Sequence, residues 1–419
     1  MRLTALVLVF LKTRSLLNRG LFVFNCDAIH IVVTMKTFMG LFSFNKKYET
    51  ILVVEMNSGG VAGAFFVREK GVAPLVLDTA RREFPRRDVS DPSRMKEDLM
   101  TALDGVISEL QKTFTGRPHR TYVILGAPWS SAEVRTVEYQ SEHDFRFTEK
   151  LGMKIVSAEM KKLSKGDSSK TIMDHRTTEV LLNGYPVESP NGKLCRSAEI
   201  RCLFSFASTQ FLSSIRDRVH RTYPSALVFS SCTMSDFITI RDLSPETQDI
   251  IILHVDAEIT EVLLVGNGRL AGTATFPIGE QTLIRKAAEI MRKGVIETDS
   301  IFSLMFSNSL DRSNLEKSGE VFGNVREIWQ DALKEILLEL SPGRHIPHTV
   351  FFPSVSMMNS YLREGMKAST FPEFTTSYSG FNAIMTDMNK LHGFISWKEG
   401  ATRDPRIAMN AIFINRSLG

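Results

Sequence analysis

The chain has 419 residues, of which 43% are hydrophobic and 23% are charged. This length suffices for two or three domains of roughly 100–200 residues each, and the composition excludes a collagen, a coiled coil, a disordered protein and a polytopic membrane protein. Lys and Arg number 51 against 47 acidic residues, so the net charge of +4 gives no case for nucleic-acid binding. The four cysteines are too scattered for a disulfide framework or a zinc cluster, which indicates a reducing compartment.

Residues 1–39 are predicted to form an N-terminal extension outside the fold. Their first apolar run, residues 3–11, is interrupted by basic residues well before the roughly 20 apolar positions that a spanning helix needs. The same basic cluster stands where a signal peptide would have small residues for cleavage. An N-terminus that associates with a membrane is the alternative that this pattern leaves open.

The first half of the chain predicts a β-hairpin followed by a helix. Residues 50–54 are a compact apolar run, residues 55–60 a polar turn with glycines, and residues 61–67 a returning strand. Asp91 followed by Pro92 is typical of a helix start, and apolar residues recur behind it at helical spacing.

Residues 132–208 differ in character from their surroundings. A helix is predicted at 148–164, and an Asn-Gly turn follows at 183–184. Residues 198–206 alternate apolar and polar side chains, as a half-buried strand does. Together these elements predict a small α+β insert.

The second half repeats the order of the first. Residues 250–255 predict a strand, residues 256–258 a polar tip, and residues 260–265 the returning strand. Further elements are predicted downstream: strands at 269–276 and 349–352, and helices at 280–292, 325–340 and 356–366. The repetition predicts two like domains facing a cleft, with the polar hairpin tips pointing into it.

This arrangement can carry chemistry. The backbone N–H groups of a hairpin tip can hold a phosphate, and small residues let that backbone approach closely. Two opposed tips can clamp the phosphates of one nucleotide while an acidic side chain holds magnesium.

Several segments resemble the actin-like ATPase superfamily, and within it the FtsA/PilM-like branch, with type IV pilus assembly proteins of the PilM type as the nearest. The resemblance is carried by residues 39–47, by 254–262, by 268–270 and by 276–279. The insert at 132–208 is similar to the SHS2-type subdomain of this branch. The resemblance implies an α/β fold with duplicated actin-like (ribonuclease H-like) domains and an inserted small α+β SHS2-like subdomain.

The resemblance also implies domain boundaries. The first actin-like domain is expected at 40–131 and 209–245, interrupted by the SHS2-like subdomain at 132–208. The second is expected at 246–419, with a helical subdomain at about 292–345.

The family's nucleotide site maps onto the two hairpins and the turn after residue 352. The nucleotide-binding residues implied are Glu55, Asn57, Ser58, Gly59, Gly60, Asp256, Ala257, Glu258, Thr260 and Ser354. The metal ligands implied are Glu55 and Asp256, and the cofactors are ATP and magnesium. No catalytic residue is assigned.

All three nucleotide loops depart from the family pattern. Glu55 stands at an Asp position and Asn57 at a Gly position of the first hairpin. Asp256 places a negative charge where a phosphate should bind, and Pro353 lacks an N–H. These departures argue against tight binding of ATP and more strongly against hydrolysis.

The expected function is therefore that of an actin-like scaffold, cytoplasmic at the inner face of the membrane. It would bind the cytoplasmic tail of an inner-membrane partner in a type IV pilus or secretion machine, with scope for self-association and only indirect membrane contact. The partner groove implied involves Ala132, Val134, Val137, Ile200, Cys202 and Phe204. Two alternatives stay open: an FtsA-like division protein that binds ATP and a tubulin-like polymer, and an active Mg-ATPase.

Overall fold

The computed structural model describes residues 17–18, 21–26, 29–34, 48–341, 345–369, 371 and 380–418. The chain divides into two compact units, Met1–Glu49 and Thr50–Gly419. In the first unit, β1 (Leu17–Asn18), β2 (Leu21–Cys26) and β3 (Ile29–Thr34) form an antiparallel sheet in that order. The apolar run at 3–11 and the segment at 39–47 lie outside the described residues.

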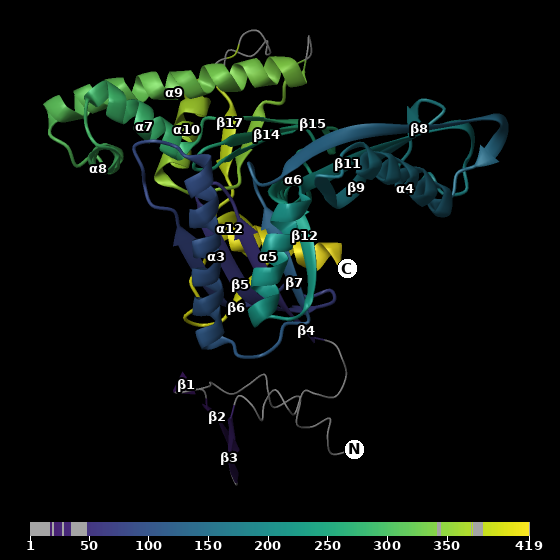
Figure 1. Ribbon diagram of the computed structural model, residues 1–419, viewed down its shortest axis with the longest axis horizontal. Coiled ribbons are helices and arrows are strands. Elements are labelled where there is room, and N and C mark those ends of the chain that lie inside the picture. Colours follow the sequence, from purple (N-terminus) through teal and green to yellow (C-terminus); the bar gives the residue numbers. More distant parts are fainter. Residues whose placement is uncertain are drawn as a thin grey trace. The chain divides into compact units, whose positions relative to one another are not determined.

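A six-stranded sheet opens the second unit, in the order β12-β7-β4-β5-β6-β18 (Figure 1). Its strands are β4 (Tyr48–Met56), β5 (Gly60–Glu69), β6 (Leu75–Glu83), β7 (Arg120–Leu125), β12 (Ala226–Ser231) and β18 (Ser396–Trp397). Strands β4, β7 and β12 run parallel, whereas β5 and β6 are antiparallel to each other. The hairpin expected at residues 50–67 is confirmed as β4 and β5.

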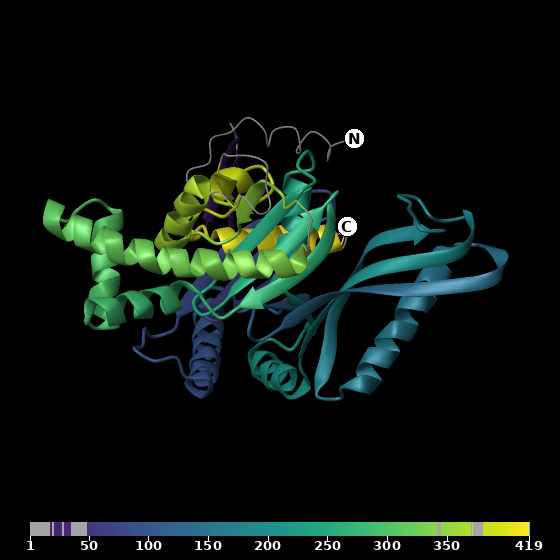
Figure 2. The same cartoon turned by 90° about the horizontal axis from the view of Figure 1, so that it is seen from above.

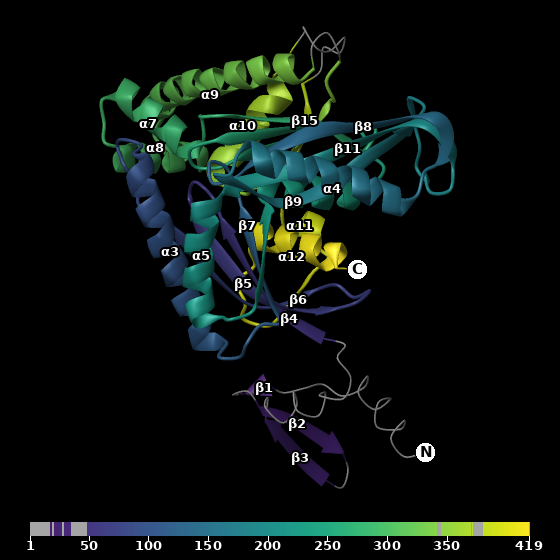
Figure 3. The same cartoon turned by 45° about the vertical axis from the view of Figure 1, so that its right-hand side comes forward.

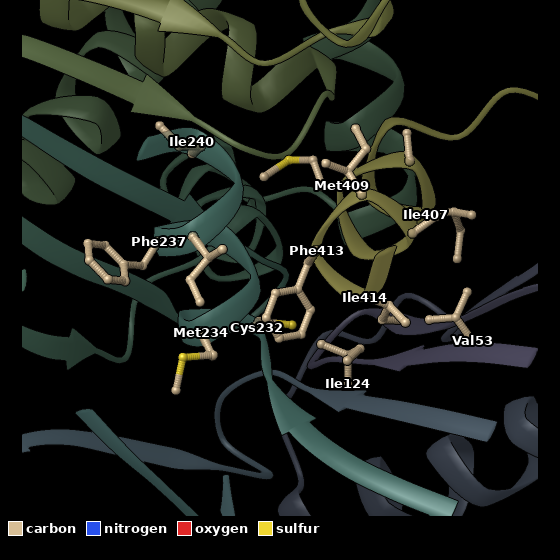
Figure 4. Packing of buried hydrophobic residues seen from close by; sticks show 14 of the residues in the cluster. Val53, Ile124, Cys232, Met234, Phe237, Ile240, Ile407, Met409, Phe413 and Ile414 are labelled. Carbon is tan, nitrogen blue, oxygen red and sulfur yellow. The ribbon is translucent and has the colours of Figure 1, made fainter. Parts of the chain in front are cut away.

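Helices cover both faces of this sheet. The helices α3 (Pro92–Thr113) and α5 (Thr209–Thr222) lie side by side on one face, as Figures 1 and 3 show. The other face packs against α6 (Cys232–Leu243) and α12 (Pro405–Ser417). Figure 4 shows Phe413 and Ile414 of α12 meeting Val53 and Ile124 of the sheet. Asp91 caps α3 as predicted, because its carboxylate accepts the backbone N–H groups of the first turn.

The five-stranded sheet has the order β15-β14-β13-β16-β17. Its strands are β13 (Ile250–Val255), β14 (Thr260–Gly266), β15 (Arg269–Phe276), β16 (Thr349–Phe352) and β17 (Asn382–Met385). Again a meander of three antiparallel strands is extended by two parallel strands. This order matches β6-β5-β4-β7-β12 strand for strand, so the predicted duplication is present in the topology.

Four helices accompany the second sheet: α7 (Glu280–Met291), α8 (Val295–Phe306), α9 (Arg312–Leu340) and α10 (Met357–Ala368). The helix predicted at 325–340 was too short, because α9 begins at Arg312 behind the cap residue Asp311. The short helix α11 (Met388–Leu391) precedes β18.

Residues 131–208 form a sheet of their own in the order β10-β9-β11-β8. It comprises β8 (Ser131–Arg146), β9 (Lys170–Leu182), β10 (Tyr185–Pro186) and β11 (Leu194–Ser208), with α4 (Glu149–Gly166) packed on one face. Figure 2 shows this sheet and α4 extending to the right of the other two sheets. The name SHS2 for this part stays a prediction.

The end of the chain corrects one predicted boundary. Residues 246–419 were all assigned to the second domain, yet β18 pairs in parallel with β6 of the first sheet. Helix α12 likewise contacts β5 and α6. The last part of the chain therefore completes the first domain, because its apolar side chains bury against that sheet.

Within the described ranges, no helix combines the length and the apolar character that crossing a membrane requires.

Candidate functional site

A cleft of about 550 Å³ lies where the two hairpin tips meet. It is bounded by the tip between β4 and β5, the tip between β13 and β14, the start of α7 and the turn after β16. Residues from each of these segments line it: Asn57, Gly59, Asp256, Ala257, Glu280 and Ser354. The expectation that the paired tips face each other is confirmed by direct contacts between them.

The first tip is capped by its own side chain. The Oδ1 atom of Asn57 accepts the backbone N–H groups of Gly59 at 3.1 Å and Gly60 at 3.0 Å. This turn is formed because an Asn side chain can bond the backbone two and three residues further on. Two N–H groups that could have faced a ligand are thereby engaged within the tip.

Asp256 of the second tip engages the third N–H group. Its Oδ2 atom accepts the backbone N–H of Ser58 at 2.6 Å and the Ser58 hydroxyl at 2.8 Å. The hydroxyl oxygen in turn accepts the backbone N–H of Glu258 at 2.9 Å. We call these three bonds between Ser58, Asp256 and Glu258 the clasp.

A buried charge network lies beneath the clasp. The Arg406 guanidinium at the start of α12 pairs with Glu55 at the end of β4, 3.2 Å from Nη2 to Oε2, and with Asp236 of α6. Asn410, one turn further along α12, also donates to Glu55. His254 of β13 places Nδ1 2.7 Å from Oδ2 of Asp236. The network thus joins both halves of the molecule.

Three members of this network have pKa values shifted toward their charged forms. Burial would lower the pKa of Arg406, but the attraction of Asp236 and Glu55 outweighs it and raises that pKa well above its ordinary value. Burial would raise the pKa of Asp236, but Arg406 and His254 hold it below its usual range. The pKa of His254 is raised because Asp236 outweighs burial and the repulsion of Arg406.

Two carboxyl groups at the cleft have raised pKa values, in contrast to Asp236. Burial raises the pKa of Asp256, opposed by His254 and by the hydrogen bonds from Ser58. Burial raises the pKa of Glu280 to about 7, opposed by Ser356, whose hydroxyl donates to Glu280 Oε1 at 2.6 Å. Glu280 therefore titrates near neutral pH.

The remaining predicted nucleotide residues lie in three environments. Ser354 and Ala257 line the cleft. Glu258 points to α7, where its carboxylate pairs with Arg285, Nη1 to Oε1 at 2.9 Å. Thr260 is buried away from the cleft, donating to the Ile278 carbonyl at 2.6 Å and accepting from Trp329 Nε1 at 2.9 Å.

The residues present do not fit Mg-ATP in the way the resemblance implies. Phosphates held by hairpin tips need free N–H groups, and magnesium needs carboxylate oxygens. The three N–H groups of the first tip already have acceptors in Asn57 and Asp256. The carboxylate of Glu55 is held by Arg406 and Asn410. No cluster of three or more metal-ligating side chains occurs among the described residues.

The predicted partner groove does not form one surface. Val137, Ile200, Cys202 and Phe204 all point into the core beneath α4, with at most 7% exposure. Ala132 and Val134 pack instead against the core around α6 and α12. The difference follows from strand alternation, which sends successive side chains of β8 to opposite faces.

A separate hollow of about 360 Å³ lies at the junction between the first sheet and the inserted one. Trp129, Phe206 and Phe211 form its aromatic wall, and Lys96 and Lys170 are also among its lining residues. The rings of Trp129 and Phe211 stack with centroids 5.3 Å apart. Trp129 also donates its indole N–H to the carbonyl of Asn57 at 2.9 Å, so one residue of the hollow's wall is bonded to the first hairpin tip.

Sequence reasoning missed Asp236, Arg406 and Asn410. A signal for two of them exists in the printed sequence. Arg406 and Asn410 are spaced i, i+4 in a helix whose other positions from 407 to 414 are all apolar, and Asp404-Pro405 repeats the helix start seen at Asp91. Polar residues one turn apart on an apolar helix predict a buried polar contact, although not its partner.

No protein-family model matches the chain. No curated protein matches it either. Among solved structures, a chain described as "PilM-PilN type IV pilus biogenesis complex" is similar over 88% of this chain and 98% of that one, with 11% identity and a TM-score of 0.57. A "MamK double helical filament" chain matches over 88% and 98% of the two chains, with 10% identity and a TM-score of 0.41. A Bacteroides thetaiotaomicron protein "with actin-like ATPase fold and unknown function" matches over 89% and 98%, with 10% identity and a TM-score of 0.38.

The protein has the actin-like fold, with duplicated α/β domains and a small inserted α+β subdomain.

Proposed function

We propose that this protein is a scaffold of a membrane-associated assembly machine of the type IV pilus or secretion kind. It binds a short cytoplasmic tail of an inner-membrane protein and works at the inner face of that membrane. The observation that carries the proposal is the junction hollow between the first sheet and the insert. The PilM-PilN chain that shares the fold is described as part of a pilus biogenesis complex, which supports this class of partner.

The chemistry of the hollow indicates its occupant. Trp129 and Phe206 are half-buried and offer ring surface, which anchors apolar side chains well. Lys96 and Lys170 are exposed and attract carboxylates. An extended peptide that carries one or two apolar anchors and an acidic residue matches this lining.

Co-purification tests the proposal. We expect the inner-membrane protein encoded beside this chain's gene, or a synthetic peptide of its cytoplasmic tail, to bind the wild-type protein. Phe206→Glu adds a like charge to an acidic peptide and removes an apolar wall, so binding should weaken at least tenfold. The control is Tyr185→Glu, on the same inserted sheet but 74% exposed and outside the hollow.

Equal binding by the wild type and Phe206→Glu would reject the junction hollow as the docking site. Charge reversal of Lys96 and Lys170 gives a second measure, because it should weaken binding in a salt-dependent way.

A further inference from the structure

We propose that the protein carries built-in substitutes for the ligands of its own cleft: Asp256 takes the place of a phosphate and Arg406 the place of a metal cation. The two halves are then held closed by side chains without a nucleotide. This inference is independent of the proposed partner.

The role of Asp256 follows from its acceptors and donors. A phosphate at a hairpin tip presents anionic oxygens to backbone N–H groups and small hydroxyls. The Asp256 carboxylate does the same toward the N–H and hydroxyl of Ser58, at 2.6 and 2.8 Å. It belongs to the opposite hairpin, so it links the halves as a bound phosphate would.

The role of Arg406 follows from the charges around it. Glu55 and Asp236 are at most 1% exposed, and two buried carboxylates require a cation nearby. The guanidinium of Arg406, itself 5% exposed, pairs with both. It therefore supplies the positive charge that a metal ion would supply between such groups.

The two tips pack closely at their point of contact beside the cleft. A Cβ atom at Gly59 would lie 3.0 Å from Cβ of Ala257 and 3.3 Å from Oδ1 of Asp256. The tips are in van der Waals contact at this point, and the absence of a side chain at Gly59 permits that approach.

Hydrogen exchange of the tip amides measures the clasp directly. In Asp256→Ala we expect the amides of Ser58 and Glu258 to exchange at least tenfold faster than in the wild type. The substitution removes both bonds from Ser58 to Asp256, and the Ser58 hydroxyl that accepts the Glu258 N–H is then no longer held in place. The matched control is Asp249→Ala, which removes a carboxylate that caps the Asn267 N–H at 2.7 Å in an exposed hairpin turn. That variant should leave exchange at the clasp unchanged.

A second variant, which acts by steric exclusion, tests the same contact if Asp256→Ala fails to fold. Gly59→Leu forces a side chain between the tips and should accelerate the same amides while Asp256 remains. Unchanged exchange at Ser58 and Glu258 in both variants would overturn the proposal.

Calorimetric titration with Mg-ATP provides the second arm. The wild type should show no binding heat at millimolar Mg-ATP. Binding in the micromolar range that Asp256→Ala weakens would overturn the proposal, because Asp256 would then serve the nucleotide instead of replacing it.

Discussion

Arg406 pairs with two buried carboxylates beneath the clasp. It neutralises Glu55 and Asp236, which come from different secondary-structure elements and lie 351 and 170 positions away in the chain. A buried ion pair of this kind adds little net stability by itself, but it is costly to break on one side only. The residue should therefore be far more sensitive than its exposed neighbours.

Replacement of Arg406 tests this directly. We expect Arg406→Met to lower the free energy of unfolding by about 3–5 kcal/mol, because two buried carboxylates lose their cation. Chemical denaturation followed by circular dichroism measures the change. The control is Arg416→Met on the same helix. Arg416 pairs with Asp242 at 2.9 Å, and both side chains are more than a quarter exposed. This substitution should lower the free energy of unfolding by only about 0–1 kcal/mol. Similar losses in the two variants would contradict the network.

The raised pKa of Glu280 should make the free energy of unfolding depend on pH. Its pKa of about 7 in the folded protein lies above the ordinary Glu value of 4.5. The folded state therefore binds the proton more tightly than the unfolded state, and stability falls as pH rises from 4.5 to 7. His254, whose pKa is also raised, loses its contribution in the same direction as pH rises through its folded pKa.

Glu280→Gln isolates the Glu280 contribution. The variant should melt at a higher temperature than the wild type at pH 8, and the difference should vanish near pH 4, where the wild-type side chain is protonated in the folded and unfolded states alike. Melting curves at both pH values decide the matter. A melting-temperature difference that is independent of pH would show that Glu280 does not titrate as described. Glu316→Gln, on an exposed side chain of α9, serves as the control.

Among the helices and strands, those that could be predicted are the ones encoded by a local pattern of apolar and polar residues. The hairpin of β13 and β14 was predicted within one residue, because two apolar runs flank a polar tip. Helix α6 was missed because it is buried all round and has no polar stripe. The first turns of α9 were missed because Gly319 and Gly323 weaken the helical pattern there.

Those two glycines offer a stability test. A Cβ atom at Gly319 or Gly323 would meet nothing within 4 Å. Alanine at either position should raise the free energy of unfolding by about 0.5–1 kcal/mol, since it restricts the unfolded chain and suits a helix interior. Thermal and urea denaturation measure the gain.

The matched control for this gain lies on α10. A Cβ atom at Gly365 would stand 2.5 Å from Cδ of Arg326. Gly365→Ala should therefore give less stabilisation than either α9 variant. Equal gains at all three positions would show that the packing around α10 is not as described.

For the whole molecule, the duplication of the two sheets could be predicted from the sequence, whereas the contacts that close the cleft between them could not. Repeated order of strand, tip and strand is a property of the sequence, so two like sheets could be expected. The contact that joins them, Ser58 with Asp256, connects residues 198 positions apart, and the pair of Arg406 with Glu55 within the first domain connects residues 351 positions apart. Such contacts depend on the completed fold, and the expectation that Asp256 only repels phosphate overlooked its bonds to Ser58.

The proposed closure of the cleft by the protein's own side chains depends on the bonds between Ser58, Asp256 and Glu258. A distance distribution between spin labels at Val72, in the turn after β5, and Ile296, on α8, tests it most directly, since both positions are at least half exposed. We expect one narrow distribution that stays the same when Mg-ATP is added. A broad distribution without nucleotide that narrows or shifts on adding Mg-ATP would contradict the claim.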